Sequence, residues 1–143
     1  ERTGTNDMGA ITAIYTVLVE GDDMNEPVAD AVRGFLDGHI VLSRKLANAN
    51  HFPAIDILRS VSRLDRAVCS ENEISLISNV RDLLSLYKQN EDLINVGAYV
   101  KGSNPKIDLA IEKFPEIEKF LRQRYDELWT RNQSLEQLSS VFA

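Results

Sequence analysis

Residues 53–67 read PAIDILRSVSRLDRA, and the character of the chain changes just beyond them. PAIDIL is typical of a short strand, because apolar and β-branched residues dominate it. Arg59, Arg63 and Arg66 follow, spaced among serines. Beyond Cys69 the apolar residues recur at helical spacing. The stretch therefore divides the chain into an α/β part, residues 1–69, and an all-α part, residues 70–143.

The α/β part alternates strand-like and helix-like segments. AITAIYTVLVE (10–20) predicts a strand covered on both faces, as in a parallel sheet. A helix follows, with Asn25 as its cap and Pro27 in its first turn. Segments 39–43 and 53–58 predict two further short strands, with a short helix between them. Strands that alternate with helices on short links indicate an α/β layer.

The all-α part carries clear helix-start signals. Ser70 and Glu73 form a capping-box pattern that begins a long helix reaching residue 95. Asn104 and the proline after it begin a second helix, which Pro115 is expected to interrupt and restart. A further capping-box pattern, at Ser134 and residue 137, predicts the final helix.

Composition excludes several classes of function. The 143 residues include 43% hydrophobic and 27% charged side chains, and the net charge of −6 is shared evenly between the two halves, so no basic patch indicates nucleic acid. No apolar run is long enough to span a bilayer, and the lone Cys69 suits a cytoplasmic protein. The opening residues, Glu1 and Arg2, indicate a cut inside a longer polypeptide.

Catalytic motifs are sparse. The phosphate-binding loop G-x-x-x-x-G-K followed by Ser or Thr does not occur. His39 and His51 lie in different predicted elements, without a Cys or acidic partner at ligand spacing, so no metal site is expected. Cys69 has no neighbouring histidine to activate its thiol. Taken alone, the chain shows no complete active site.

Four segments carry a resemblance that extends over essentially the whole chain: GAITAIYTVLVEGDDMNEPVAD (9–30), LDGHIVLSRKLA (36–47), HFPAIDILRSVSRL (51–64) and INVGAYVKGSN (94–104). Together they resemble the type III export ATPases, relatives of the rotary ATP synthase subunits. The flagellar branch is the most similar, on VGAYVKGS (96–103), and the injectisome branch is the alternative.

The resemblance implies that the chain is the C-terminal third of a longer enzyme. Residues 1–69 would complete a RecA-like, P-loop nucleotide-binding core, and residues 70–143 would form the C-terminal helical bundle. Such enzymes are homohexamers that bind ATP and Mg²⁺ between subunits. The phosphate loop would lie upstream, so this chain alone is expected to hydrolyse no ATP.

The partners follow from the same resemblance. They would be a central coiled-coil stalk protein, a peripheral regulator, and export chaperone–substrate complexes. The enzyme would be cytoplasmic and peripherally associated with the inner face of the cytoplasmic membrane. Two other functions stay open: a chaperone-docking helical module, and a non-catalytic ring subunit.

Arg63 is the predicted catalytic residue. In the family, the arginine of the segment that matches SVSR (60–63) reaches across the subunit boundary to the ATP of the neighbour. A planar guanidinium suits this task, because charge spreads over the phosphoryl oxygens during transfer. The alternative is an ordinary surface arginine that pairs with Asp65, Asp56 or a helix end.

Other site residues are implied by resemblance alone. Phe52 matches an aromatic residue that stacks on adenine, and its alternative is a core phenylalanine. Tyr125 would close the other side of the base, with Trp129 as a rival. Asp22 and Asp23 match an acidic pair that lines the central opening of the ring and faces the stalk, and their alternative is a solvated turn.

Overall fold

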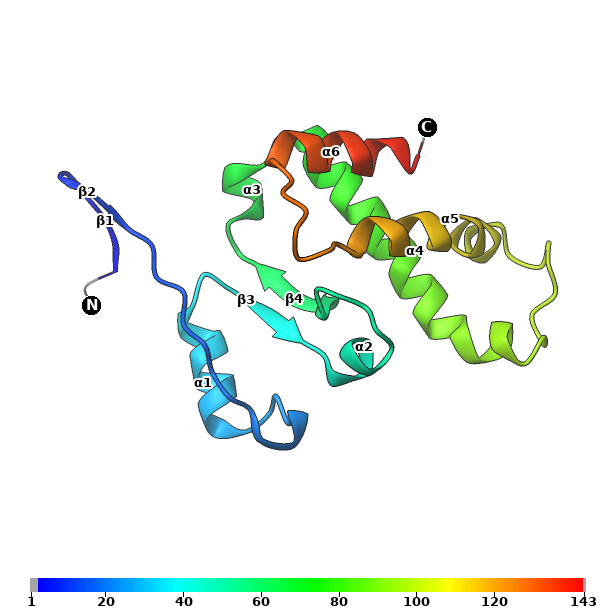
Figure 1. Cartoon of the computed structure of the whole chain (residues 1–143), viewed down its shortest axis with the longest axis horizontal. Coiled ribbons are helices and arrows are strands. Elements are labelled where there is room, and N and C mark those ends of the chain that lie inside the picture. Colours follow the sequence, from blue (N-terminus) through cyan, green and yellow to red (C-terminus); the bar gives the residue numbers. More distant parts are fainter. Residues whose placement is uncertain (1–2, 143) are drawn as a thin grey trace. The chain divides into compact units, whose positions relative to one another are not determined.

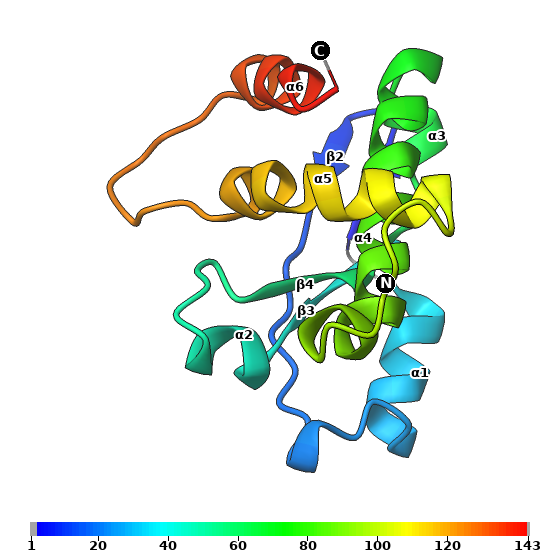
Figure 2. The same cartoon turned by 90° about the vertical axis from the view of Figure 1, so that its right-hand side faces the viewer.

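The computed structural model describes residues 3–142, apart from the side chain of Asp22. The chain forms two compact units, residues 1–36 and residues 37–143, and each is described by itself. Figures 1 and 2 show the elements of both units from two directions. Among the described residues, no helix is both long enough and apolar enough to cross a membrane.

The first unit contains a small hairpin, a 3₁₀ turn and one helix. Strand β1 (Gly4–Asn6) pairs antiparallel with β2 (Gly9–Ile11), and a 3₁₀ turn, η1, covers Glu20–Asp22. The predicted strand over residues 10–20 is therefore wrong beyond its first two residues. Ile14 and Leu18 are exposed, and residues 12–19 have no strand assignment. An apolar, β-branched segment needs a neighbouring strand to bond its backbone, and no described strand lies beside this one.

Helix α1 (Pro27–Phe35) begins one residue later than the sequence predicts. Pro27 occupies the first turn as expected, but the N-cap is Glu26 rather than Asn25. The Asn25 amide instead donates to the Asp23 carboxylate at 2.9 Å. Asn25 therefore belongs to the turn before the helix, because an aspartate two residues earlier already bonds its backbone.

In the second unit, β3 (Gly38–Leu42) and β4 (Ile55–Ser62) form a two-stranded sheet. The strands are antiparallel, so the predicted parallel arrangement is wrong. The connection explains the result: helix α2 (Arg44–Asn48) is only just over one turn long, and the Ser43 amide donates to the Ala54 carbonyl at 2.8 Å. The chain thus reverses beside β3 and does not cross over to its beginning, as a parallel pair requires.

Helix α4 (Glu71–Asn95) confirms the predicted capping box. The Glu73 amide donates to the Ser70 hydroxyl, and the Glu73 carboxylate accepts from the Ser70 amide at 2.6 Å. A one-turn helix, α3 (Asp65–Val68), connects β4 to α4. The capping box follows from a local sequence signal, whereas α3 was not predicted.

Helix α5 (Pro105–Leu121) begins with Asn104 as its N-cap, as predicted, but it continues through Pro115 without a restart. Ala110 before the proline and Ile117 after it are both buried in the same core. Burying these side chains against one core outweighs the single backbone hydrogen bond that proline removes.

Helix α6 (Arg131–Ser140) begins one turn before the predicted position. Its capping box is formed by Thr130 and Gln133, and the expected cap Ser134 is inside the helix, where its hydroxyl donates to the Thr130 carbonyl at 3.1 Å. The same residue spacing occurs twice in this segment, and the earlier occurrence caps the helix.

The core of the second unit lies among α4, α5 and α6. Its buried residues are Val80, Leu83, Ala110, Ile117, Leu138 and Val141. At one side of it the rings of Tyr87 and Phe114 stack with centroids 3.6 Å apart. An ion pair of 2.8 Å between Arg131 and Glu73 joins the start of α6 to that of α4. This packing joins the three helices around one core.

Candidate functional site

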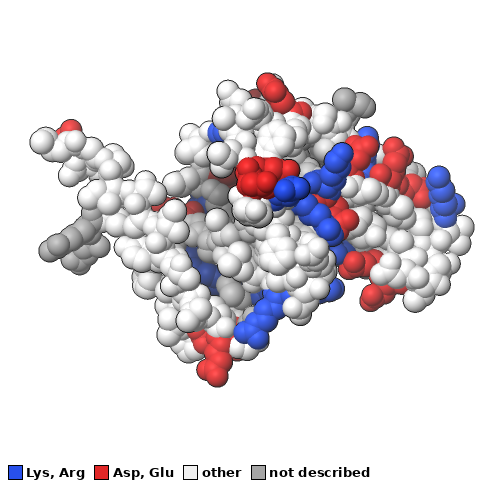
Figure 3. All heavy atoms as spheres, in the orientation of Figure 1, with Lys and Arg blue, Asp and Glu red and all other residues white. Residues whose placement is uncertain are grey.

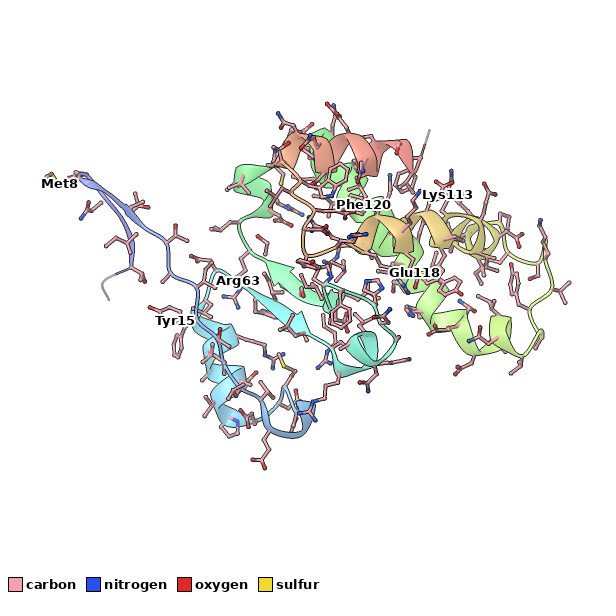
Figure 4. All side chains as sticks on the ribbon, in the orientation of Figure 1. Met8, Tyr15, Arg63, Lys113, Glu118 and Phe120 are labelled. Atoms are coloured by element: carbon pink, nitrogen blue, oxygen red, sulfur yellow. The ribbon has the colours of Figure 1, made fainter. Side chains whose placement is uncertain are left out.

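Arg63 is the first residue after β4. Its backbone amide donates to the Asp37 carbonyl at 2.8 Å, and the residue is exposed. Figure 4 shows Arg63 beside the end of the β3–β4 pair. The main chain at Arg63 is therefore held by the sheet, while the residue is open to solvent.

Gly38 permits a close approach of the two strands just before Arg63. Gly38 pairs with Ser62, and a Cβ atom at Gly38 would lie 2.6 Å from the Val61 carbonyl oxygen. Real Cβ atoms essentially never come so near to another heavy atom. Any larger residue at Gly38 would therefore push apart the strands that position Arg63.

A bulge interrupts β4 and ends three residues before Arg63. The pairing of His39 with Val61 is followed by that of Val41 with Asp56, so residues 57–60 stand opposite the single residue Ile40. Backbone groups in such a bulge lose their partners on the neighbouring strand. Side chains supply replacements for several of them.

Asp56 and Ser60 bond the bulge from within. The Asp56 carboxylate accepts the backbone amides of Leu58 and Arg59, each at 3.1 Å. The Ser60 hydroxyl donates to the Asp56 carbonyl at 2.6 Å and accepts from the Val41 amide at 3.0 Å. Asp56 is thus occupied by backbone amides of the bulge.

Two side chains from other elements reach the carbonyls of the bulge. His39 Nε2 lies 3.1 Å from the Arg59 carbonyl oxygen. From α4, the Arg81 guanidinium donates to the Ser60 carbonyl at 3.3 Å and to the Leu58 carbonyl at 3.4 Å. Sequence reasoning missed Arg81, because nothing in its helical neighbourhood signals a bond to residues more than twenty positions earlier.

Phe52 and Tyr125, the two residues predicted to hold adenine, lie on adjoining loops. The Phe52 carbonyl accepts the Gln123 amide at 2.9 Å. Phe52 is 52% exposed, and Tyr125 is 98% exposed in a turn closed by a bond of 3.2 Å from the Glu127 amide to the Arg124 carbonyl. Two open aromatic rings are therefore carried by loops that a main-chain hydrogen bond connects.

The predicted stalk-facing pair lies in the first unit. The side chain of Asp22 is outside the described residues. Asp23 is exposed, and its carboxylate caps the turn through the Asn25 amide.

A cleft of about 330 Å³ lies beside the bulge. It is lined by residues of α2, β4, α4 and α5, among them Leu46, Ile57, Leu84, Phe114 and Leu121. His51 is buried at the wall of the cleft. This burial lowers the pKa of the imidazole, and the nearby Arg122 lowers it further. Glu118, whose Oε1 lies 4.0 Å from His51 Nδ1, acts in the opposite direction. In the described part of the chain, no group of three His, Cys, Asp or Glu residues could hold a metal ion.

On the face in Figure 3, both acidic and basic side chains are present, and several of the basic ones have acidic ones beside them. This distribution is typical of a solvated surface.

Two family models match the chain. The nucleotide-binding domain of the ATP synthase alpha/beta family matches residues 1–62, and the C-terminal domain of the type III secretion ATPase EscN matches residues 69–140. The boundary predicted at residues 69 and 70 is not tested by the structure and stays a prediction.

Curated relatives come from both branches of export systems. The chain is 51% identical to the flagellum-specific ATP synthase of Bacillus subtilis over 99% of its length, and 50% identical, over the same share, to the SPI-2 type 3 secretion system ATPase of Salmonella typhimurium. It spans 32% and 33% of these proteins, about a third of their length.

Solved structures agree with this assignment. The chain matches the assembled ATPase EscN of the enteropathogenic E. coli type III secretion system with a TM-score of 0.95 and 42% identity, over 99% of this chain and 34% of that one. It matches EscN in complex with its central stalk EscO with a TM-score of 0.88 and 40% identity, over 99% of this chain and 33% of that one. The chain therefore belongs to the type III secretion ATPase family, within the wider ATP synthase alpha/beta group.

Proposed function

We propose that this chain is the C-terminal third of a homohexameric ATPase that couples ATP hydrolysis to flagellar protein export. Relatives named as flagellum-specific ATP synthases and as type 3 secretion system ATPases match it over nearly all its length. The flagellar assignment rests on residues 96–103, because relatives of the two branches have almost the same identity to the chain.

We propose that Arg63 is the catalytic residue, and the main support is the way in which its backbone is held. The structure fixes the main chain of Arg63 through Asp37 and the close β3–β4 contact at Gly38, while the residue itself is exposed. An exposed guanidinium on a fixed main chain can donate two hydrogen bonds to phosphoryl oxygens. We assign Arg63 to the ATP of the neighbouring subunit, where it would stabilise the charge that develops during phosphoryl transfer.

The proposed adenine contacts are Phe52 and Tyr125. Their exposed rings offer flat apolar faces, and stacking of a base requires little more. When bound, Mg²⁺ would neutralise phosphate charge, and we place none of its ligands on this chain.

The proposed partners follow from the family. EscN is known in complex with a central stalk, EscO, which supports a stalk contact for this chain through Asp22 and Asp23. We further propose contacts with a peripheral regulator and with export chaperone–substrate complexes, in the cytoplasm at the inner face of the membrane.

The decisive experiment uses the full-length enzyme. Arg63→Ala is expected to lower kcat by about 10³-fold or more while ATP binding is retained, because the arginine acts on charge that develops only in the transition state. Arg63→Lys is expected to restore little of this loss. Arg66→Ala is the matched control, since Arg66 is also exposed and lies three residues later. Near-normal turnover in Arg63→Ala would refute the role.

A mixing experiment tests whether Arg63 acts on the neighbour. Subunits with Arg63→Ala are mixed with subunits that lack the lysine of the phosphate loop, and each type alone is inactive. If the arginine acts across the interface, mixed rings contain some interfaces with both groups intact and regain part of the activity. If it acts within its own subunit, mixed rings stay inactive.

A further inference from the structure

The bulge in β4 has carbonyl groups that the sheet does not bond, and a side chain from the helical domain reaches two of them. We infer that Arg81 is a positioning residue for Arg63, through which the helical domain sets the place of the arginine. This inference rests on the proposed role of Arg63 at the nucleotide.

The bulge depends on side chains for its shape. Residues 57–60 have only Ile40 opposite them, so their carbonyls lack the regular ladder partners. Leu58 and Ser60 are half-buried, where an unpaired carbonyl is costly. The Arg81 guanidinium donates to both of these carbonyls, one from each terminal nitrogen.

Arg81 is itself on a helix that is packed into the core. Its helical neighbours Val80 and Leu83 are buried in the core that α4 shares with α5 and α6. The guanidinium is planar with its donors in fixed directions, so it holds the two carbonyls at a set spacing from α4. A lysine at this position offers one flexible ammonium group, which cannot hold both carbonyls in that way.

The connection from the bulge to Arg63 is short. Only Val61 and Ser62 separate the Ser60 carbonyl from Arg63, and both are paired with β3. The Arg63 amide is then bonded to Asp37. A shift of α4 relative to the sheet would therefore be passed along fully paired backbone to Arg63, with no flexible residue to absorb it.

Arg81 contacts the backbone of β4 and is assigned no contact with nucleotide. Its removal should therefore affect kcat much more than the KM for ATP. A displacement of about 1 Å at a catalytic group can cost about a hundredfold in rate.

The test uses Arg81→Met and Arg81→Lys in the full-length hexamer. Arg81→Met keeps an apolar stem of similar length on α4, and we expect it to lower kcat about tenfold to a hundredfold with the KM for ATP almost unchanged. Arg81→Lys is expected to restore part of the loss. Arg131→Met is the matched control, because it removes the Arg131–Glu73 pair, which involves α4 but is assigned no bond to the bulge, and it should leave kcat nearly unchanged.

A double-mutant cycle with Arg63 shows whether the two residues act together. In an Arg63→Ala background, Arg81→Met is expected to cost less than about twofold, because the group that it positions is already absent. If Arg81→Met lowered kcat equally in both backgrounds, or raised KM alone, the inference would be wrong.

Failure of the inference is distinct from failure of the proposed function. A large loss in Arg63→Ala with no loss in Arg81→Met would overturn the positioning role only. Retained turnover in Arg63→Ala would overturn both. If Arg81→Met did not assemble, the same cycle with Arg81→Lys would decide by the same criteria.

Discussion

The close contact at Gly38 allows a sharp prediction for Gly38→Ala. An added Cβ would lie 2.6 Å from the Val61 carbonyl oxygen and 3.3 Å from the Ser62 Cα. Both atoms belong to the main chain of β4, so no side-chain rotation relieves the overlap. The backbone torsion angle φ of Gly38 is not in the left-handed region, so the effect comes from the overlap alone.

The loss of stability in Gly38→Ala depends on how the two strands respond to the added Cβ. Either β3 and β4 separate by several tenths of an ångström, or the Val61 peptide rotates and weakens its pairing with His39. Overpacking of this kind costs about 1–3 kcal/mol in the free energy of unfolding. Arg63 lies two residues after Val61, so this displacement of the β4 backbone is expected to reach Arg63 and to lower kcat by about tenfold or more.

Gly34→Ala provides the matched control. Gly34 lies in α1, its φ is not left-handed, and among the described residues a Cβ added there meets nothing within 4 Å beyond its own helix backbone. The same substitution there should stabilise the protein by about 0.5 kcal/mol, because alanine favours the helix over glycine. The two variants are thus predicted to change stability in opposite directions.

Urea unfolding and steady-state ATP hydrolysis of the full-length enzyme measure the two effects. Gly38→Ala should lower both the urea midpoint and kcat, whereas Gly34→Ala should lower neither. A Gly38→Ala enzyme with the midpoint and kcat of the parent would refute the reasoning, because it would show that the strands near Arg63 can move apart at no cost.

Two further predictions concern the helical domain. Ile117→Ala should lower the free energy of unfolding by about 2–5 kcal/mol, because Ile117 is 0% exposed. Leu109→Ala on the same helix should lower it by less than about 1 kcal/mol, because Leu109 is 42% exposed. Equal urea midpoints for the two variants would contradict this prediction. The Arg131 guanidinium, together with hydrogen bonds from the Ser70 amide and hydroxyl, lowers the pKa of Glu73 to about 2. The stabilisation from these contacts is therefore present above pH 4.5 and is lost as pH falls towards 2. Glu73→Gln should flatten the dependence of the urea midpoint on pH in that window, and an unchanged slope would count against the ion pair.

Local signals predicted the helical part well. The capping box of Ser70 and Glu73 and the cap at Asn104 are formed by residues within one turn of the bonds that they make. Such signals are readable in a single sequence because no distant partner is needed. The misplaced start of α6 has the same origin, since Thr130 and Ser134 carry the same short-range signal.

The strands were predicted less well, because their arrangement depends on pairing between residues far apart in the sequence. The segment at residues 10–20 has the composition of a strand, but composition does not reveal whether another strand lies beside it. The antiparallel arrangement of β3 and β4 depends on how the chain turns between Ser43 and Ala54. The continuation of α5 through Pro115 likewise depends on core contacts made by residues on both sides.

The candidate site was predictable in part. Arg63, Phe52 and Tyr125 came from resemblance to a family, and the structure adds where each lies and what holds its backbone. Arg81 carries no such signal, because its contacts join a helix face to a strand bulge that the sequence does not reveal. The bulge itself follows from pairing register, which depends on both strands.

The bond between the Gln123 amide and the Phe52 carbonyl bears on how the proposed adenine contacts could change. Because only main-chain atoms form it, the identities of the side chains at positions 52 and 125 do not affect it. Either ring can therefore be exchanged for another aromatic or an aliphatic group while the two loops keep their spacing. If the two rings stack on adenine as we propose, single substitutions at positions 52 and 125 should therefore change base selectivity while the loop framework stays intact.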